Sequence, residues 1–283
     1  MVSAGVELVD VSDGVFARLH EGLTNAGIIV GDEGVMIIDS LRVPSFARAL
    51  IEDVRKITSK PIKYVIDTHS HWDHSWGNEE FPDATIIGHQ NCRAEMLDIE
   101  AQELWMNKIV TSKESWSEEA RTVTITPPAM TFNSKLSMYF GGRVIELRYF
   151  GRAHTSGDIF IFLPEDKLVF TGDVAQDSGV PFMMDGYMED WVETGRLLCE
   201  LPVDRFISGH GPVGGHEALV EAKDFINELV STTKECIGNG QSNHEAVEVI
   251  LKKLNNRFGH WRGFDRVEDS IEFTFRQILQ NGG

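Results

Sequence analysis

A dense cluster of metal-binding residue types occupies residues 67–78 of this 283-residue sequence, which read Asp-Thr-His-Ser-His-Trp-Asp-His-Ser-Trp-Gly-Asn. His69 and His71 are two positions apart, so both can turn toward one metal ion from a loop that leaves a strand. Asp73 and His74 follow on the same loop and can reach a second ion. Imidazole and carboxylate ligands suit zinc, and also manganese or iron. Because such groups are costly to pack densely without a cation, the cluster predicts a metal site.

Three further candidate ligands lie beside predicted strands. His154 precedes a strand in Gly-Arg-Ala-His-Thr-Ser-Gly-Asp, Asp173 follows another in Thr-Gly-Asp, and His210 follows a short apolar run in Ile-Ser-Gly-His-Gly-Pro. Each alone is a weak signal. Together with the cluster they complete two coordination shells.

The elements that must position these residues form two similar series, one before and one after about residue 128. The first series contains antiparallel strands from Val6 to Asp39 with a hairpin turn at 31–34, a helix over about 44–58, strands at 61–66 and 84–88, a helix from about Asn91 and a helical segment over 99–120. The second contains strands at 135–139, 143–149, 158–163 and 167–170, a turn at 164–166, and helices at 188–200, 216–237, 243–256 and 267–280. No Gly-, Ser- or Pro-rich linker separates the series, so we expect one α/β domain over residues 1–283.

The ordered set of candidate ligands resembles the metallo-beta-lactamase superfamily in sequence order and approximate spacing. Residues 25–39, with Asn-Ala-Gly-Ile-Ile-Val and Gly-Val-Met-Ile-Ile-Asp, are similar to the first hairpin of that family. The resemblance covers about residues 10–215. It implies a four-layer αββα sandwich of two mixed sheets, with the metal site at one edge and a core over about 6–215. The helical extension over about 216–283 would cover an outer face or form an interface.

The resemblance also implies how the ligands divide between two zinc ions, with manganese or iron as alternatives. Its pattern places His69, His71 and His154 on one ion, Asp73, His74 and His210 on the other, and Asp173 between both. A metal lowers the pKa of bound water to about 7, so a hydroxide held between the ions can attack a carbonyl carbon at neutral pH. Asp73 is the expected catalytic residue, because a ligand at that position can also orient the hydroxide or carry its proton.

Departures from the family pattern bear on the substrate. Zinc beta-lactamases of the best-known group have Cys at the position of Asp173, whereas a bridging Asp is similar to glyoxalase II, lactonases and phosphodiesterases. The lactonase pattern has Tyr where this sequence has Gln176, and no basic pocket for glutathione is recognisable. Segment 176–188 lacks helix or strand periodicity and predicts an apolar pocket wall. The expected substrate-binding residues are Trp72, Phe182, Met183 and Tyr187.

We therefore expect a binuclear metal-dependent hydrolase that cleaves a carboxylic ester, lactone, thioester or amide of a fairly apolar small molecule. Three alternatives stay open. One is beta-lactamase-type C–N hydrolysis, another is an oxidoreductase with one iron that resembles persulfide dioxygenases, and the last is a non-catalytic metal-binding protein.

The amino-acid composition limits the classes of binding partner that we expect. The formal net charge is −18, from 26 Lys and Arg against 44 Asp and Glu, which disfavours nucleic acid and membrane surfaces. The expected partner is a small-molecule substrate, and a homodimer through the C-terminal helices stays open. Three scattered cysteines predict reduced thiols. The first thirty residues lack a basic start followed by an apolar stretch, which predicts a cytoplasmic location.

Overall fold

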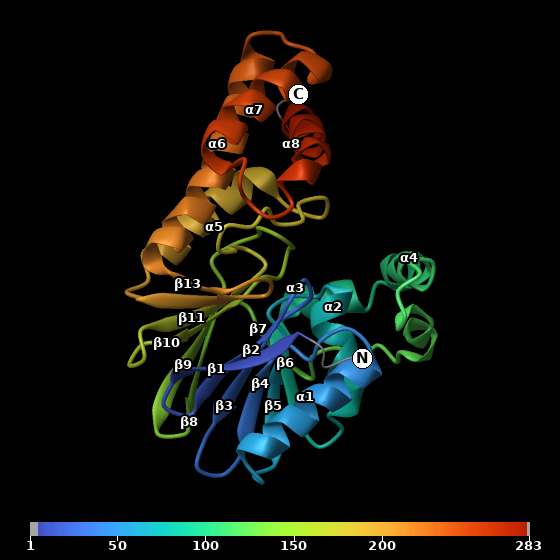
Figure 1. Cartoon of the computed structure of the whole chain (residues 1–283), viewed down its shortest axis with the longest axis vertical. Coiled ribbons are helices and arrows are strands. Elements are labelled where there is room, and N and C mark those ends of the chain that lie inside the picture. Colours follow the sequence, from blue (N-terminus) through green and yellow to red (C-terminus); the bar gives the residue numbers. More distant parts are fainter. Residues whose placement is uncertain (1–4, 282–283) are drawn as a thin grey trace.

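Two β-sheets pack face to face with helices on both outer faces in the computed structural model, which describes residues 5–281 (Figure 1). The first sheet has the strand order β1-β2-β3-β4-β5-β6-β7, and the second has the order β13-β12-β11-β10-β9-β8. Both sheets are mixed, because β4 and β5 run parallel in the first, as β11 and β12 do in the second, beside antiparallel pairs. This arrangement confirms the expected αββα sandwich.

The two strand series of the sequence are the two sheets. The first sheet contains β1 (Val6–Ser12), β2 (Val15–His20), β3 (Ala26–Val30), β4 (Val35–Ile38), β5 (Ile62–Ile66), β6 (Thr85–His89) and β7 (Met130–Phe132). The second contains β8 (Lys135–Phe140), β9 (Arg143–Arg148), β10 (Phe160–Leu163), β11 (Leu168–Gly172), β12 (Arg205–Ser208) and β13 (Val213–Gly215). The predicted turns at 31–34 and 164–166 join the antiparallel pairs β3–β4 and β10–β11.

Apolar side chains fill the space between the sheets. Every residue of β10 and β11 is buried, because one face of these strands meets the first sheet and the other meets helices. The sheets approach closely at Gly27, where a Cβ would lie 2.4 Å from Phe170 Cε1. Any larger residue there would have to displace the Phe170 ring of the opposite sheet.

One outer layer covers the first sheet. It contains α1 (Pro44–Ile57), α2 (Trp72–Ser75), α3 (Gln90–Met96) and α4 (Ile99–Val110), with short 3₁₀ helices at Trp76–Glu80 and Ser117–Thr122. Helix α1 begins with Pro44, which suits a first helical turn, and buries its apolar face against the sheet. The helix expected over 99–120 is only partly present. It ends at Val110, where the Thr111 hydroxyl donates to the Asn107 and Lys108 carbonyls and Lys113 adopts a positive φ of 65°.

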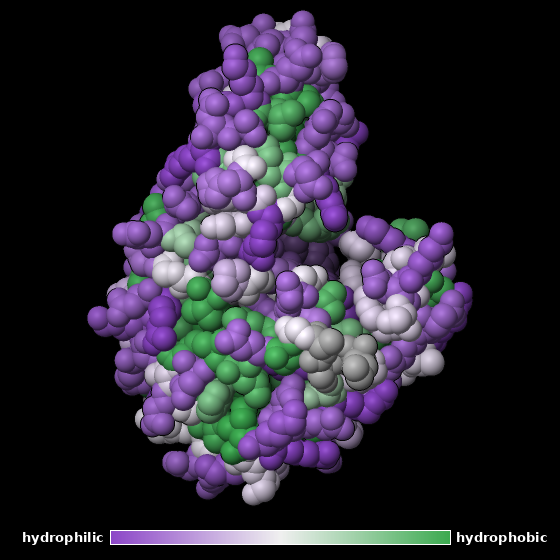
Figure 2. Space-filling model, viewed as in Figure 1, coloured by the Kyte–Doolittle hydropathy of each residue, from purple (hydrophilic) through white to green (hydrophobic). Residues whose placement is uncertain are grey.

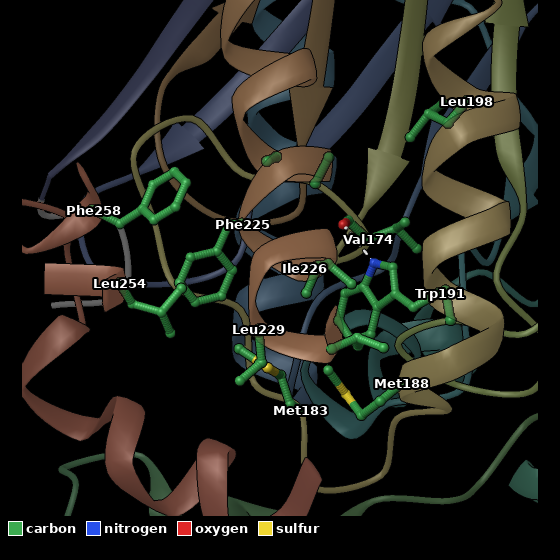
Figure 3. Close-up of a cluster of buried hydrophobic side chains, with 14 of the residues drawn as sticks. Val174, Met183, Met188, Trp191, Leu198, Phe225, Ile226, Leu229, Leu254 and Phe258 are labelled. Atoms are coloured by element: carbon green, nitrogen blue, oxygen red, sulfur yellow. Dashed lines mark hydrogen bonds between the residues drawn. The ribbon is translucent and has the colours of Figure 1, made fainter. Parts of the chain in front are cut away.

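The other outer layer contains the C-terminal helices. They are α5 (Met188–Cys199), α6 (His216–Gly238), α7 (Asn243–Phe258) and α8 (Val267–Asn281), with a 3₁₀ turn at Phe264–Arg266. Their bounds agree with the predicted helices within two residues. Figure 3 shows apolar side chains of α5, α6 and α7 converging with Val174 and Met183, and the same buried cluster includes residues of the second sheet and of α8. The C-terminal extension therefore covers an outer face, as expected.

Among the described residues, none of the helices combines the length and apolar character needed to cross a bilayer. All three cysteines are free thiols, with Cys92 and Cys236 buried and Cys199 partly exposed. This agrees with the prediction of reduced thiols.

Candidate active site

All seven candidate ligands meet at one edge of the sandwich. His69, His71, Asp73 and His74 lie on the loop and short helix α2 that follow β5, and Asp173 and His210 follow β11 and β12. Three groups have potential ligand atoms within 4.8 Å of one another: His69, His71 and His154; Asp73, His74 and His210; and His69, His74 and Asp173. The third group shares a residue with each of the others, so Asp173 lies between the two triads.

Each of the five candidate ligand histidines has one ring nitrogen next to an oxygen atom that can accept a hydrogen bond from it. The Nδ1 atom of His154 lies 2.8 Å from the Phe182 carbonyl oxygen, and that of His210 lies 3.0 Å from the Leu23 carbonyl oxygen. A carbonyl only accepts, so Nδ1 carries the proton and Nε2 is left as the ligand nitrogen. His71 has the opposite orientation, with Nε2 3.2 Å from the Asp185 carboxylate.

Asp39 orients the other two histidines. Its carboxylate accepts from His74 Nδ1 at 2.8 Å, from the Thr68 amide at 2.8 Å and from the Thr68 hydroxyl at 2.8 Å. Because that hydroxyl donates to Asp39, it accepts from His69 Nδ1 at 2.9 Å. The φ angle of Asp39 is +61°, a left-handed conformation that Asp tolerates better than most residues. Asp39 therefore supports the candidate ligands His69 and His74 from outside the ligand set.

Three of the inward-facing atoms, His69 Nε2, His74 Nε2 and Asp173 Oδ1, are buried without a hydrogen-bond partner within residues 5–281. His154 Nε2 and His71 Nδ1 face each other at 2.8 Å. Asp173 lies 3.4 Å from His74 Nε2 and 3.3 Å from His210 Nε2. Buried polar atoms without partners are rare, and a set of imidazole and carboxylate donors in this arrangement fits divalent metal ions.

The charges of the site also favour cations. Burial, with the neighbouring imidazoles, lowers the pKa of His154 to about 3, so this residue is in the neutral form that binds metal. Burial opposes a charge on His210 as well, but Asp173 and Asp73 raise the pKa of His210 to about 9. His74 and His210 in turn hold the pKa of Asp73 well below its usual range despite its burial.

A chain of polar contacts fixes Asp73. The Thr24 hydroxyl donates to Asp73 Oδ2 at 2.7 Å, and Arg42 Nη2 donates to Thr24 Oγ1 at 2.9 Å. The Arg42 guanidinium is buried against the rings of Phe46, Trp72 and Trp116, with its Cζ 5.0 to 5.4 Å from the ring centroids. Sequence analysis did not identify Thr24 or Arg42, because they lie far from the histidine cluster along the chain.

Gly209 and Gly211, on either side of His210, are glycines for different physical reasons. Gly211 has a φ of +90°, a backbone conformation that glycine adopts without strain. Gly209 is needed for space instead, because a Cβ would lie 2.1 Å from Asp173 Oδ1 and 2.6 Å from His74 Cε1.

An aromatic cavity of about 260 Å³ opens beside His71, with Trp72, Trp105 and Tyr187 among its lining residues. The rings of Trp105 and Phe182 each lie 6.0 Å from the His71 ring. Figure 2 shows a hollow in the surface between the lobe that carries α4 and the C-terminal helices.

Met183, predicted from its type alone, lies elsewhere. It is fully buried among the C-terminal helices, so it does not face the cavity and the expectation of substrate contact is not met (Figure 3). Trp76, in the histidine-rich segment, is a core residue with 1% exposure. The other five histidines, His20, His89, His216, His244 and His260, belong to none of the three ligand groups within residues 5–281.

Comparison with known families gives the affiliation of the chain. The family model described as the metallo-beta-lactamase superfamily matches residues 20–210. The chain belongs to that superfamily. Members are mostly metal-dependent hydrolases, and the His and Asp groups at the sheet edge agree with metal binding.

Individual superfamily relatives are distant. The chain is 23% identical to a linear primary-alkylsulfatase of Pseudomonas sp. (strain ATCC 19151) over 294 residues, 89% of this chain and 54% of the relative. It is 23% identical to a metallo-beta-lactamase type 2 of Bacillus cereus over 212 residues, 73% of this chain and 74% of the relative.

A solved double mutant of the sec-alkyl sulfatase PisA1 has the same fold, with a TM-score of 0.77 at 17% identity, over 97% of this chain and 50% of that one. This chain thus spans about half the length of both sulfatases.

Within this superfamily site, two supporting carboxylates were not predicted from the sequence. Asp185 holds His71 and lies in segment 176–188, which was identified only as a pocket wall. Glu95, on α3, accepts from the Ser156 amide at 3.1 Å and from the hydroxyls of Ser70 and Ser156. Glu95 therefore connects the loop of His69 and His71 to the loop of His154.

Proposed function

We propose that this chain is a hydrolase whose active site holds two metal ions, zinc in the simplest case, and cleaves an ester-type bond of a small molecule. The observation that carries the proposal is the pair of histidine-containing triads connected by Asp173. The orientation of the ring nitrogens supports it, since the outer nitrogens are held and the inner ones converge.

The ligand roles divide between the two triads. His69, His71 and His154 would hold one ion, Asp73, His74 and His210 the other, and Asp173 would contact both. When bound, such ions supply a hydroxide at neutral pH by lowering the pKa of bound water to about 7. Asp73 would accept a proton from the attacking water. The Thr24 hydroxyl fixes one of its oxygens by a hydrogen bond, and His74, His210 and Arg42 hold the carboxylate charged.

The cavity beside His71 supports an apolar substrate. Trp72, Trp105 and Tyr187 line this cavity next to His71, and the Phe182 ring packs against that of Trp105. Carboxylic esters, lactones, thioesters and amides with an apolar group would place that group against these rings. The amides include beta-lactams, in which the C–N bond of the ring would be cleaved.

Elemental analysis and a chromogenic substrate panel test the proposal. We expect about two metal ions per chain and turnover of 4-nitrophenyl esters that a chelator abolishes. His71→Ala should lose metal and activity, whereas the matched control His244→Ala, with an 87% exposed side chain, should keep both. One iron per chain with oxygen consumption and no hydrolysis would contradict the proposal.

Sulfate-ester hydrolysis is the second candidate. The observation that favours it is the fold likeness to a sec-alkyl sulfatase over 97% of this chain, which includes the C-terminal helices, whereas the metallo-beta-lactamase from Pontibacter korlensis covers 78%. Comparing 4-nitrophenyl sulfate with 4-nitrophenyl acetate separates the candidates. If the sulfate is turned over faster, sulfate esters replace carboxylic esters as the proposed substrate class.

A further inference from the structure

The turn between α7 and α8 reaches the active-site edge of the sandwich. In Figure 1 this red segment descends from the C-terminal helices toward the loops that follow β11. The Arg262 amide donates to the Ser178 carbonyl at 2.9 Å, and the Val180 amide donates to the Arg262 carbonyl at 2.9 Å. These two bonds form a β-bridge between Gly179 and Arg262, so the turn is attached to the loop that follows Asp173.

The guanidinium of Arg262 lies against the residue that follows His210. A Cβ on Gly211 would lie 2.2 Å from Arg262 Nη2 and 2.5 Å from Nη1, so the group rests directly on the Gly211 backbone. Neighbouring Cα atoms are about 3.8 Å apart. Arg262 is therefore within the length of a small substrate from His210, the histidine candidate with the most exposed side chain, at 27%.

Arg262 is held in place but keeps its charge available. Its Nη2 donates to the Asp177 carbonyl at 2.7 Å. Within residues 5–281, no carboxylate oxygen lies within 4.0 Å of its guanidinium, whereas nearby Arg257 contacts Asp224 at 2.8 Å. In a chain of net charge −18, a fixed and unneutralised guanidinium at the edge of the active site is suited to bind an anion.

We propose that Arg262 is a substrate-binding residue that recognises an anionic group, a carboxylate or a sulfate, on the substrate of this site. The inference rests on the proposed hydrolase function and names its substrate class. The substrate would place its apolar part in the cavity beside His71 and its anionic group on the His210 side. The C-terminal helices would thereby contribute directly to specificity.

A matched pair of esters tests the proposal with the metal-loaded protein. 4-Nitrophenyl acetate and mono-4-nitrophenyl succinate share a leaving group and differ by a carboxylate on the acyl part. We expect wild type to prefer the succinate in kcat/KM. Arg262→Gln should reduce that preference about 10- to 100-fold, the effect of one charge-assisted hydrogen bond. The loss should lie mainly in KM, acetate turnover should stay within about two-fold, and Arg262→Lys should restore part of the preference.

Arg266→Gln is the control, because Arg266 lies in the same turn and its 86% exposed side chain lies 4.0 Å from Asp265. It should leave both esters unaffected. If Arg262→Gln slows both esters equally or lowers the metal content, Arg262 is structural and the proposal is wrong. An unchanged preference also overturns it.

A failure of the proposed hydrolase function can be distinguished from a failure of the proposed role of Arg262. If neither ester is cleaved by wild type, calorimetric binding of 4-(4-nitrophenoxy)butanoate and of the matched alcohol 4-(4-nitrophenoxy)butan-1-ol still tests Arg262. Tighter binding of the acid that disappears in Arg262→Gln supports anion recognition. Equal binding of acid and alcohol by wild type refutes it.

Discussion

Replacing Asp39 with Asn changes one atom at the residue that orients two of the candidate metal ligands. Asn tolerates the left-handed φ of +61° about as well as Asp does, so the backbone is not strained by the substitution. The carboxylate of Asp39 accepts three hydrogen bonds at 2.8 Å, from His74 Nδ1 and from the amide and hydroxyl of Thr68. An amide nitrogen in place of one oxygen cannot accept any of them.

Both orientations of the new amide are unfavourable. If its nitrogen faces the Thr68 amide, two donors oppose each other. If it faces His74 and the Thr68 hydroxyl, it donates to both, and the rings of His74 and His69 must move their protons to the inward nitrogens, where metal would bind. Either way the site loses about one charge-assisted hydrogen bond, about 1.5–3 kcal/mol. We expect the affinity for zinc to fall about 10- to 100-fold.

A competition titration with a chelating dye measures this affinity in Asp39→Asn, in wild type and in Asp32→Asn. Asp32 is exposed on the β3–β4 hairpin, so its replacement should leave zinc binding unchanged. Elemental analysis and the rise in Tm on adding zinc provide independent readouts. Wild-type zinc affinity in Asp39→Asn would refute the idea that this carboxylate sets the ligand tautomers.

Three further predictions concern the metal, the site backbone and a buried ion pair. Removing metal with a chelator should abolish hydrolysis and lower the Tm, because a ligand at 1,000 times its Kd stabilises the folded state by about 4 kcal/mol; calorimetry and zinc add-back check this. Gly209→Ala should lose metal and activity in a folded protein, because its Cβ would displace Asp173; circular dichroism and metal content measure it. Asp53→Asn should cost about 3–5 kcal/mol at pH 7 by leaving Arg18 buried without its partner at 2.7 Å. Burial opposes the charge on Asp53, yet hydrogen bonds from Lys56 and Arg18 keep the pKa of Asp53 below its usual value of about 3.9. The stabilisation by the ion pair is therefore present above that pH. The difference in unfolding free energy between variant and wild type should become smaller as the pH falls toward 3, as measured by urea titrations.

The ligand set was accessible from the sequence because its signal is local and ordered. Four candidates lie within six residues, and His154, Asp173 and His210 each lie next to a strand, where a sheet edge brings side chains together. The bounds of the C-terminal helices were also accessible, since apolar spacing acts within a few positions, whereas the end of α4 at Val110 was not.

The supporting residues were not accessible, because each depends on a contact between distant segments. Asp185 and Arg262 carry no local pattern, and they acquire a role only when segment 176–188 and the α7–α8 turn fold against the site. Met183 shows the converse. Its type fits a pocket wall, but α6, α7 and α8, which contribute to the buried cluster around it, follow it only after β12 and β13.

Segment 176–188 has two functions in this fold, and the C-terminal helices determine its conformation. It forms the wall of the cavity, and it also holds two ligands, because the Phe182 carbonyl accepts from His154 and Asp185 contacts His71. On α8, the Gln277 side chain donates to the Gly186 carbonyl at 2.8 Å and accepts from the Met188 amide at 2.8 Å. A substrate that shifts this segment would therefore act on the histidines as well, and a change in α8 would reach both. The helices beyond residue 216 are thus part of the scaffold on which the candidate metal site depends.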